Sequence, residues 1–222
     1  VYFSIGMKGP MEHIGVQDLS LPYGKIMRVH DDGRIPLDNP FLKDSNAIKA
    51  IWSYGHRNPQ GLEFNNETNE LWSSEMGPRG GDEINLIQPG LNYGWPLISK
   101  GVDYTGKPLN FAKLLGIEFD INNMVQPLVD LTPAPAISSF IFYQGEQFPE
   151  WAGNIIIGSL RASDLMRFEF EQKNLVSTEY LLKDIARFRD IGVGYDGSIY
   201  VLLENDSGGR ILKISRPSTK GL

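Results

Sequence analysis

The feature that most constrains the fold is a loose internal repeat of short strand-like runs. Runs rich in Val, Ile, Tyr, Phe and Trp are cut at regular intervals by Gly, Pro, Asn and Asp, a pattern typical of all-β proteins. Each copy predicts a strand, a polar turn, a second strand, a loop and a third strand. The strands expected in three copies are 61–64, 70–73 and 83–87; 139–142, 154–158 and 164–168; and 190–193, 198–202 and 210–214. Residues 1–5 and 24–29 are expected to supply the back half of a fourth copy.

Antiparallel meanders that repeat every roughly 40–50 residues are typical of β-propeller blades. A chain of 222 residues accommodates about four such blades, with an insertion near residues 99–135. We therefore predict an all-β partial propeller that forms a single domain over residues 1–222, with a β-sandwich as the alternative. One modest helix is predicted, at residues 42–51.

Composition excludes several classes of protein. The net charge of −6 makes general binding to nucleic acid unexpected. No apolar stretch approaches the roughly 18 residues that a membrane span requires. The absence of Cys excludes disulfides, thiolate metal sites and a cysteine nucleophile. Serine hydrolases and nucleotide enzymes are disfavoured, because neither a nucleophile elbow nor a phosphate-binding glycine loop is found.

Several arginines are expected to gather at one rim of the sheets. The start of the first strand and the end of the second share a rim, because neighbouring strands of a meander are antiparallel. The notable residues at these positions are Arg57, Asn58, Gly77, Pro78, Arg161, Arg187 and Arg189. Four clustered arginines repel one another unless an anion lies among them, and their guanidinium groups suit a carboxylate or a phosphate. The alternative is that each arginine pairs with a local acid, such as Glu63, Glu75, Asp184 or Asp190.

A glycine-rich loop at residues 75–85 places backbone carbonyls beside the adjacent acids Asp82 and Glu83. Hard oxygen ligands of this kind suit Ca²⁺, although a solvated acidic turn explains the same residues. The aromatic residues of the following segment, 92–96, fit either core packing or the wall of a pocket. His56 is expected to be structural, and none of the three histidines lies in a recognisable metal pair.

These segments together resemble the soluble quinoprotein aldose (glucose/sorbosone) dehydrogenases. The motifs that carry the resemblance lie in register at 54–61, 77–85, 92–96, 148–154, 158–161 and 187–190. Members of that family are six-bladed β-propellers that bind pyrroloquinoline quinone (PQQ) and Ca²⁺ and are usually exported to the periplasm. They oxidise the anomeric carbon of an aldose sugar to the lactone and pass the electrons to an external acceptor. The resemblance therefore implies a periplasmic or secreted enzyme, and it leaves open whether the protein is a homodimer.

Carried over position by position, the resemblance implies a set of site residues. It assigns contacts with PQQ to Arg57, Asn58, Ser159, Leu160, Arg161, Arg187, Phe188 and Arg189. It assigns the carbonyls of Gly77 and Pro78 to the Ca²⁺ that polarises the quinone. Glu83 and Tyr93 match a second, structural Ca²⁺ site.

The sequence departs from the family in one serious respect. The family's catalytic histidine precedes the strand that matches residues 1–5, so the base is expected upstream of Val1, and His13, His30 and His56 do not take its place. Since Val1 opens in strand-like composition without an initiating Met, we expect a fragment or processed product that is inactive alone.

Two smaller departures are Met76, where a polar residue is common, and Arg161, where a lysine often stands. Two other functions remain open, a non-catalytic Ca²⁺-stabilised propeller that acts as a binding module and a Ca²⁺-dependent propeller lactonase. The arginine set favours the dehydrogenase over the lactonase, because a hydrolase needs no polyanion site.

Overall fold

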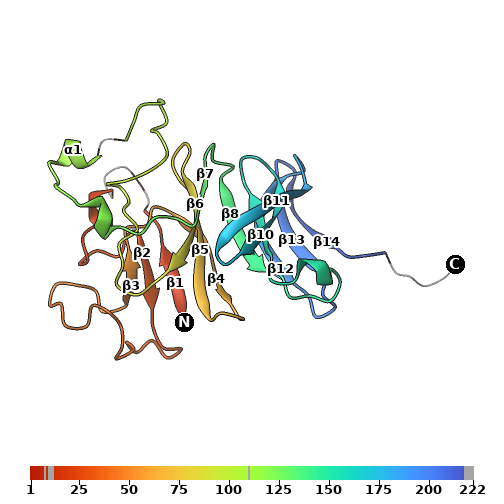
Figure 1. Ribbon diagram of the computed structural model, residues 1–222, viewed down its shortest axis with the longest axis horizontal. Coiled ribbons are helices and arrows are strands. Elements are labelled where there is room, and N and C mark those ends of the chain that lie inside the picture. The colour runs from red at the N-terminus through yellow and green to blue at the C-terminus, as the bar shows by residue number, and fades with distance from the viewer. Residues whose placement is uncertain (8, 10–12, 110, 218–222) are drawn as a thin grey trace. The chain divides into compact units, whose positions relative to one another are not determined.

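The computed structural model describes residues 1–7, 9, 13–109 and 111–217, and its regular structure is almost entirely antiparallel strand (Figure 1). Internal contacts divide the chain into two compact units. The first contains Val1–Leu62 and Asn69–Ala134, and the second contains Glu63–Thr68 and Pro135–Leu222. The single domain expected over residues 1–222 stays a prediction.

Two antiparallel sheets organise the first part of the chain. One has the strand order β1-β2-β3 and the other the order β4-β5-β6-β7. Their strands are β1 (Tyr2–Ile5), β2 (Lys25–Arg28), β3 (Ile51–Tyr54), β4 (Pro59–Asn65), β5 (Glu70–Glu75), β6 (Asp82–Ile87) and β7 (Val129–Leu131). A buried cluster of Ile26, Leu71, Ile87 and Tyr93 forms an apolar core here.

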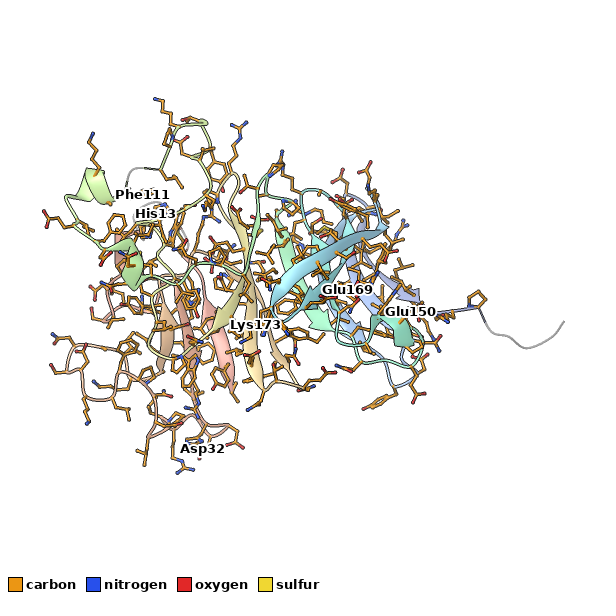
Figure 2. The ribbon with its side chains drawn as sticks, in the orientation of Figure 1. His13, Asp32, Phe111, Glu150, Glu169 and Lys173 are labelled. Atoms are coloured by element: carbon orange, nitrogen blue, oxygen red, sulfur yellow. The ribbon has the colours of Figure 1, made fainter. Side chains whose placement is uncertain are left out.

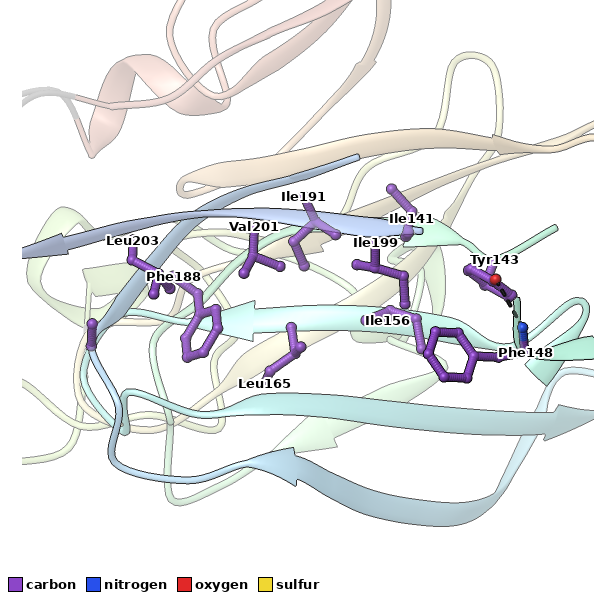
Figure 3. Packing of buried hydrophobic residues seen from close by; sticks show 11 residues of the cluster. Ile141, Tyr143, Phe148, Ile156, Leu165, Phe188, Ile191, Ile199, Val201 and Leu203 are labelled. Carbon is purple, nitrogen blue, oxygen red and sulfur yellow. Dashed lines mark hydrogen bonds between the residues drawn. The ribbon is translucent and has the colours of Figure 1, made fainter. Parts of the chain in front are cut away.

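Two more antiparallel sheets form the second unit, in the orders β11-β10-β9-β8 and β12-β13-β14. Their strands are β8 (Ile137–Phe142), β9 (Ile155–Ser159), β10 (Leu165–Glu171), β11 (Asn174–Leu182), β12 (Arg187–Val193), β13 (Ile199–Asn205) and β14 (Gly208–Ile214). Figure 3 shows the core between these sheets, in which Ile141, Ile156, Phe188, Ile191 and Val201 pack together. In β12, the buried residues Phe188 and Ile191 are separated by the two exposed residues Arg189 and Asp190, and Phe188 lies between the exposed Arg187 and Arg189.

The predicted repeat is confirmed, because every expected strand overlaps an observed one. The pattern missed β3, β7 and β11, of which β7 lies inside the expected insertion at 99–135.

The helix predicted at residues 42–51 is wrong. Those residues form successive turns, and Ile51 begins β3. The Asp44 side chain accepts a hydrogen bond from the Asn46 backbone N–H at 2.9 Å, and the Ala47 N–H donates to the Asp44 carbonyl three residues back. Asp and Asn side chains compete for backbone groups in this way, which favours turns over a helix.

Among the residues that the structure describes, helical structure is limited to short segments. They are the α-helix α1 (Phe111–Leu115) and the 3₁₀ turns at Ile14–Val16, Ile121–Asn123 and Pro149–Trp151. Among the described residues, no helix has the length and apolar character needed to cross a membrane.

Candidate functional site

The residues predicted for the site are shared between the two units. Arg57, Asn58, Gly77, Pro78, Glu83 and Tyr93 belong to the first unit, and Ser159, Leu160, Arg161, Arg187, Phe188 and Arg189 belong to the second. Within each unit, the structure brings some of these predicted residues close together. The convergence of all four arginines on one rim stays a prediction, because it joins the two units.

Arg57 follows β3 and is held at both its backbone and its side chain. Its backbone N–H donates to a carboxylate oxygen of Glu75, and its carbonyl accepts from the Met7 N–H at 3.0 Å. The guanidinium donates from Nη1 to the Met76 carbonyl at 2.8 Å and from Nη2 to the Tyr104 hydroxyl at 3.2 Å. Its remaining nitrogen, Nε, is buried and has no hydrogen-bond partner among the described residues.

Arg57 and Asn58 line a cavity of about 320 Å³, together with Pro78 and several aromatic residues. The Arg57 guanidinium carbon lies 5.5 Å from the centre of the Trp95 ring, within the range of a cation–π contact. Trp95 is 4% exposed and also lines the cavity. Core packing and a pocket wall, the two interpretations of segment 92–96, are therefore both correct for this residue. The aromatic walls suit a planar ligand, and the lining contains one guanidinium, that of Arg57, and one carboxylate, that of Asp103.

Sequence reasoning missed several residues that line the same cavity, among them the ring-bearing residues His13, Tyr104 and Phe111. His13 lies 4.4 Å from Phe111 between ring centres, and Figure 2 shows the two side chains close together. Tyr104 lies in the insertion at 99–135, as does Phe111. These residues come from loops and a short helix with no strand periodicity, so no pattern in the sequence marked them.

The loop that contains Gly77 and Pro78 is tightly folded. The Gly77 N–H donates to Asp82 at 2.9 Å, and a Cβ added at Gly77 would overlap the carbonyl oxygen of Gly80. Only glycine allows this close approach of backbone to backbone. The fold of this loop brings the carbonyl oxygens of Gly80 and Gly81 close to Gly77, and backbone carbonyl oxygens are among the ligands that Ca²⁺ takes.

Glu83 and Tyr93 line a second cavity of about 270 Å³. Burial, followed by the nearby Glu75 carboxylate, raises the pKa of Glu83 to about 8. Asn85 donates to Glu83 at 3.2 Å, and its own carbonyl oxygen is buried without a hydrogen-bond partner among the described residues. A buried carboxylate beside a second carboxylate and an unused amide oxygen fits a bound cation.

Tyr93 would serve a cation through its backbone. Its hydroxyl already donates to the Leu86 carbonyl at 2.6 Å and accepts from the Gln88 N–H at 2.9 Å. Among the described residues, no three His, Cys, Asp or Glu side chains gather so as to hold a metal ion. Ca²⁺ at either position would therefore depend on carbonyl oxygens as well as on Glu83.

In the second unit, Arg187 and Arg189 converge on one acid. The Nε atoms of both arginines face the same carboxylate oxygen of Glu204, at 3.6 Å for Arg187. A register shift between Phe188 and Asp190 makes Arg189 the extra residue of a β-bulge. The predicted pairing of these arginines with a local acid therefore occurs, but its partner is Glu204. Asp190 instead accepts from the Ser139 hydroxyl at 2.8 Å.

Ser159, Leu160 and Arg161 leave the end of β9 in a turn. Ser159 and Leu160 are buried, and the Ser159 hydroxyl bonds with the backbone of Asp164 at 2.9 and 3.2 Å. The Arg161 N–H donates to the Pro135 carbonyl at 3.1 Å, and its side chain is exposed. A ligand of this turn would meet the Arg161 side chain and backbone atoms of its neighbours. A ligand near Phe188 would likewise meet only its backbone atoms, because the Phe188 ring lies in the core.

Comparison with known proteins identifies the family. The Glucose / Sorbosone dehydrogenase family model matches residues 1–213. The chain is 42% identical over 203 residues to aldose sugar dehydrogenase YliI of Escherichia coli (strain K12), which covers 90% of this chain and 53% of that protein. It is 28% identical over 248 residues to quinoprotein glucose dehydrogenase B of Acinetobacter calcoaceticus, covering 89% of this chain and 51% of that protein.

A comparison with solved structures points to the same family. The soluble aldose sugar dehydrogenase from Escherichia coli in its apo-form superposes with a TM-score of 0.88 at 37% identity, over 97% of this chain and 60% of that one. The chain thus spans about half the length of the curated relatives it matches. Its four antiparallel sheets have the predicted all-β propeller fold. The chain belongs to the Glucose / Sorbosone dehydrogenase family.

Proposed function

We propose that this chain is part of a PQQ-dependent aldose dehydrogenase, which oxidises the anomeric carbon of a sugar to the lactone and passes electrons to an external acceptor. The observation that carries the proposal is Arg57, a guanidinium at the wall of an aromatic cavity with a buried nitrogen that no described residue satisfies. A buried donor without a partner is costly, and a carboxylate of the cofactor would satisfy it. The family match and the quinoprotein relative support the same cofactor.

Each unit contains residues to which the family resemblance assigns contacts with the cofactor. Arg57 and Asn58 would bind and orient it in the first unit, while Trp95 excludes water from one wall. In the second unit, Arg187 and Arg189 would exchange their shared Glu204 for cofactor carboxylates, with Arg161 adding a third positive charge.

Ca²⁺ would be held in the loop of Gly77 and Pro78, and a second ion would be held by Glu83 and the backbone of Tyr93. Bound PQQ would supply the two-electron acceptor for oxidation of the sugar, and Ca²⁺ held by the Gly77–Pro78 loop would supply a Lewis acid beside it. His56 is fully buried, and we assign it no contact with the sugar. We further propose a periplasmic or secreted location, on the strength of the family resemblance.

The proposal is tested by titrating the full-length polypeptide with PQQ at saturating Ca²⁺ and following the quinone absorbance. Arg57→Ala and Arg189→Ala are each expected to weaken binding about tenfold or more, because each removes a charged hydrogen-bond donor. Arg34→Ala is the matched control, since Arg34 is exposed and paired with Asp32 in a remote turn. Binding by both variants that equals that of the control would overturn the assigned site.

The two other functions predict different results in the same experiment. A binding module would take up no PQQ in the presence of Ca²⁺. A lactonase would hydrolyse a sugar lactone without PQQ and would reduce no acceptor. A dehydrogenase would reduce an artificial acceptor only when PQQ, Ca²⁺ and an aldose are all present.

A further inference from the structure

Three buried polar side chains form a continuous chain of hydrogen bonds that ends at the backbone N–H of Arg57. The Ser53 hydroxyl lies 2.8 Å from His56 Nε2, and His56 Nδ1 lies 3.0 Å from one carboxylate oxygen of Glu75. The other Glu75 oxygen accepts from the backbone N–H of Arg57. We call these three residues the Ser53–His56–Glu75 relay. Both oxygens of Glu75 are thereby occupied, one by the relay and one by the residue that lines the cavity.

Burial decides what the relay is able to do. A serine, a histidine and a carboxylate in this order have the connectivity of a nucleophilic triad. However, Ser53 and His56 are 0% exposed and Glu75 is 5% exposed, so a substrate has no access to the Ser53 hydroxyl. The relay therefore acts through the residue that it holds.

The surroundings of His56 keep the relay in one geometry. Its ring stacks on the Tyr93 ring with the centres 4.5 Å apart and the planes 24° apart. Its backbone N–H donates to the Gly24 carbonyl at 3.1 Å. The preceding Gly55 has a φ of +80°, and a Cβ there would overlap the Asn92 side chain. The imidazole is thus held by the Tyr93 ring and by the fixed backbone of its own segment.

The relay fixes the backbone from which the guanidinium projects. With its N–H held by Glu75 and its carbonyl held by Met7, Arg57 directs its side chain along the cavity wall toward Met76 and Tyr104. A site residue binds more tightly when its neighbours hold it in the bound geometry beforehand. We propose that the Ser53–His56–Glu75 relay is a positioning device, with Glu75 the positioning residue that holds Arg57 ready for a carboxylate of the cofactor. This inference rests on the proposed function.

The first test is Glu75→Gln in the full-length polypeptide, with PQQ affinity measured at saturating Ca²⁺. A carboxamide offers one acceptor oxygen in place of two, so either the Arg57 N–H loses its acceptor or His56 must take the tautomer in which Nδ1 accepts from the new NH₂ group. We expect PQQ to bind about tenfold more weakly, as is common for residues that orient a ligand-binding group. Amide hydrogen exchange of Arg57 without PQQ should become faster, which reports on the backbone without any cofactor.

Ser53→Ala keeps the inference testable if Glu75→Gln does not fold. Ser53 does not line the cavity and its hydroxyl bonds with His56, so a change in PQQ binding would be transmitted through His56. We expect roughly two- to tenfold weaker binding, the effect of one hydrogen bond. Ser73→Ala is the matched control, because Ser73 is also 0% exposed but its hydroxyl has no hydrogen-bond partner among the described residues.

A double-mutant cycle separates positioning from general stability. In the Arg57→Ala background, Glu75→Gln should cause no further loss of PQQ affinity, since its effect passes through Arg57. If Glu75→Gln and Ser53→Ala lower the melting temperature but bind PQQ as the control does, the relay is only structural and the inference is wrong. If Arg57→Ala itself binds PQQ normally, the proposed cofactor site is wrong and the inference falls with it.

Discussion

Lys25 illustrates at the scale of one residue how this chain accommodates a buried charge. The side chain is 0% exposed, and its ammonium group donates to the carbonyls of Val16 at 2.8 Å and Tyr23 at 2.7 Å. A third carbonyl, that of Gly15, lies 3.4 Å away. These contacts tie the segment before β2 to the start of that strand. Burial lowers the pKa of Lys25 to about 8.

The lowered pKa predicts a pH dependence of stability. Between about pH 8 and pH 10.5, the unfolded state keeps the Lys25 proton and the folded state releases it. Since the unfolded state binds more protons there, the free energy of unfolding should rise with pH across this window. Urea unfolding of the wild type and of Lys25→Met at several pH values measures the effect as a difference. Parallel curves for the two proteins would show that Lys25 does not titrate in this range.

At the scale of one element, β9 is the most constrained strand of the second unit. All of its residues are buried, and it lies between β8 and β10 in the sheet. Ile156 of this strand belongs to the core shared with β12 and β13. In contrast, β14 is an edge strand whose Ile211 is 73% exposed. The same residue type thus has very different surroundings in two strands of one unit.

This contrast predicts the cost of two substitutions. Ile156→Ala should lower the free energy of unfolding by about 2–5 kcal/mol, because it removes buried methyl groups and leaves a cavity. Ile211→Ala should change it by less than about 0.5 kcal/mol. Chemical denaturation of both variants provides the measurement. Equal losses would mean that β14 is covered in the protein in solution.

At the scale of the whole molecule, the proposed Ca²⁺ ligands are unevenly distributed. Gly77, Pro78, Glu83 and Tyr93 all belong to the first unit. An ion that binds only the folded protein stabilises it by mass action, by about 2.7 kcal/mol when its free concentration is 100 times Kd. Removal of Ca²⁺ should therefore weaken the first unit and leave the second unit unchanged.

Hydrogen exchange with and without a chelator tests this distribution. Amides of β5 and β6 should exchange faster after Ca²⁺ is removed, while those of β9 and β13 should keep their rates. Glu83→Gln should remove most of the difference, because it replaces the charged ligand. Faster exchange throughout both units would contradict placement of the ions in the first unit alone.

Strands and motifs were the predictable part of this protein. Short runs of branched and aromatic residues bounded by turn residues mark strands such as β9 and β13 along the chain itself, because this composition and punctuation are local properties of a sequence. The segment 42–51 shows the limit, since its apolar spacing suits a helix while the Asp44 side chain favours a turn. The acidic partner of Arg187 and Arg189 also could not be predicted from the sequence. Glu204 pairs with Arg187 because β12 and β13 are in register, and register depends on packing.

By itself, the sequence determined the all-β repeat, the family and the positions of the motif residues, because these are properties of neighbours along the chain. Only the tertiary structure decided which side chains meet around Arg57. His13, Trp95 and Tyr104 reach its cavity from separate loops, and Glu75 reaches its N–H from another strand. Contacts between residues far apart in sequence depend on loop paths and burial, which leave no local pattern.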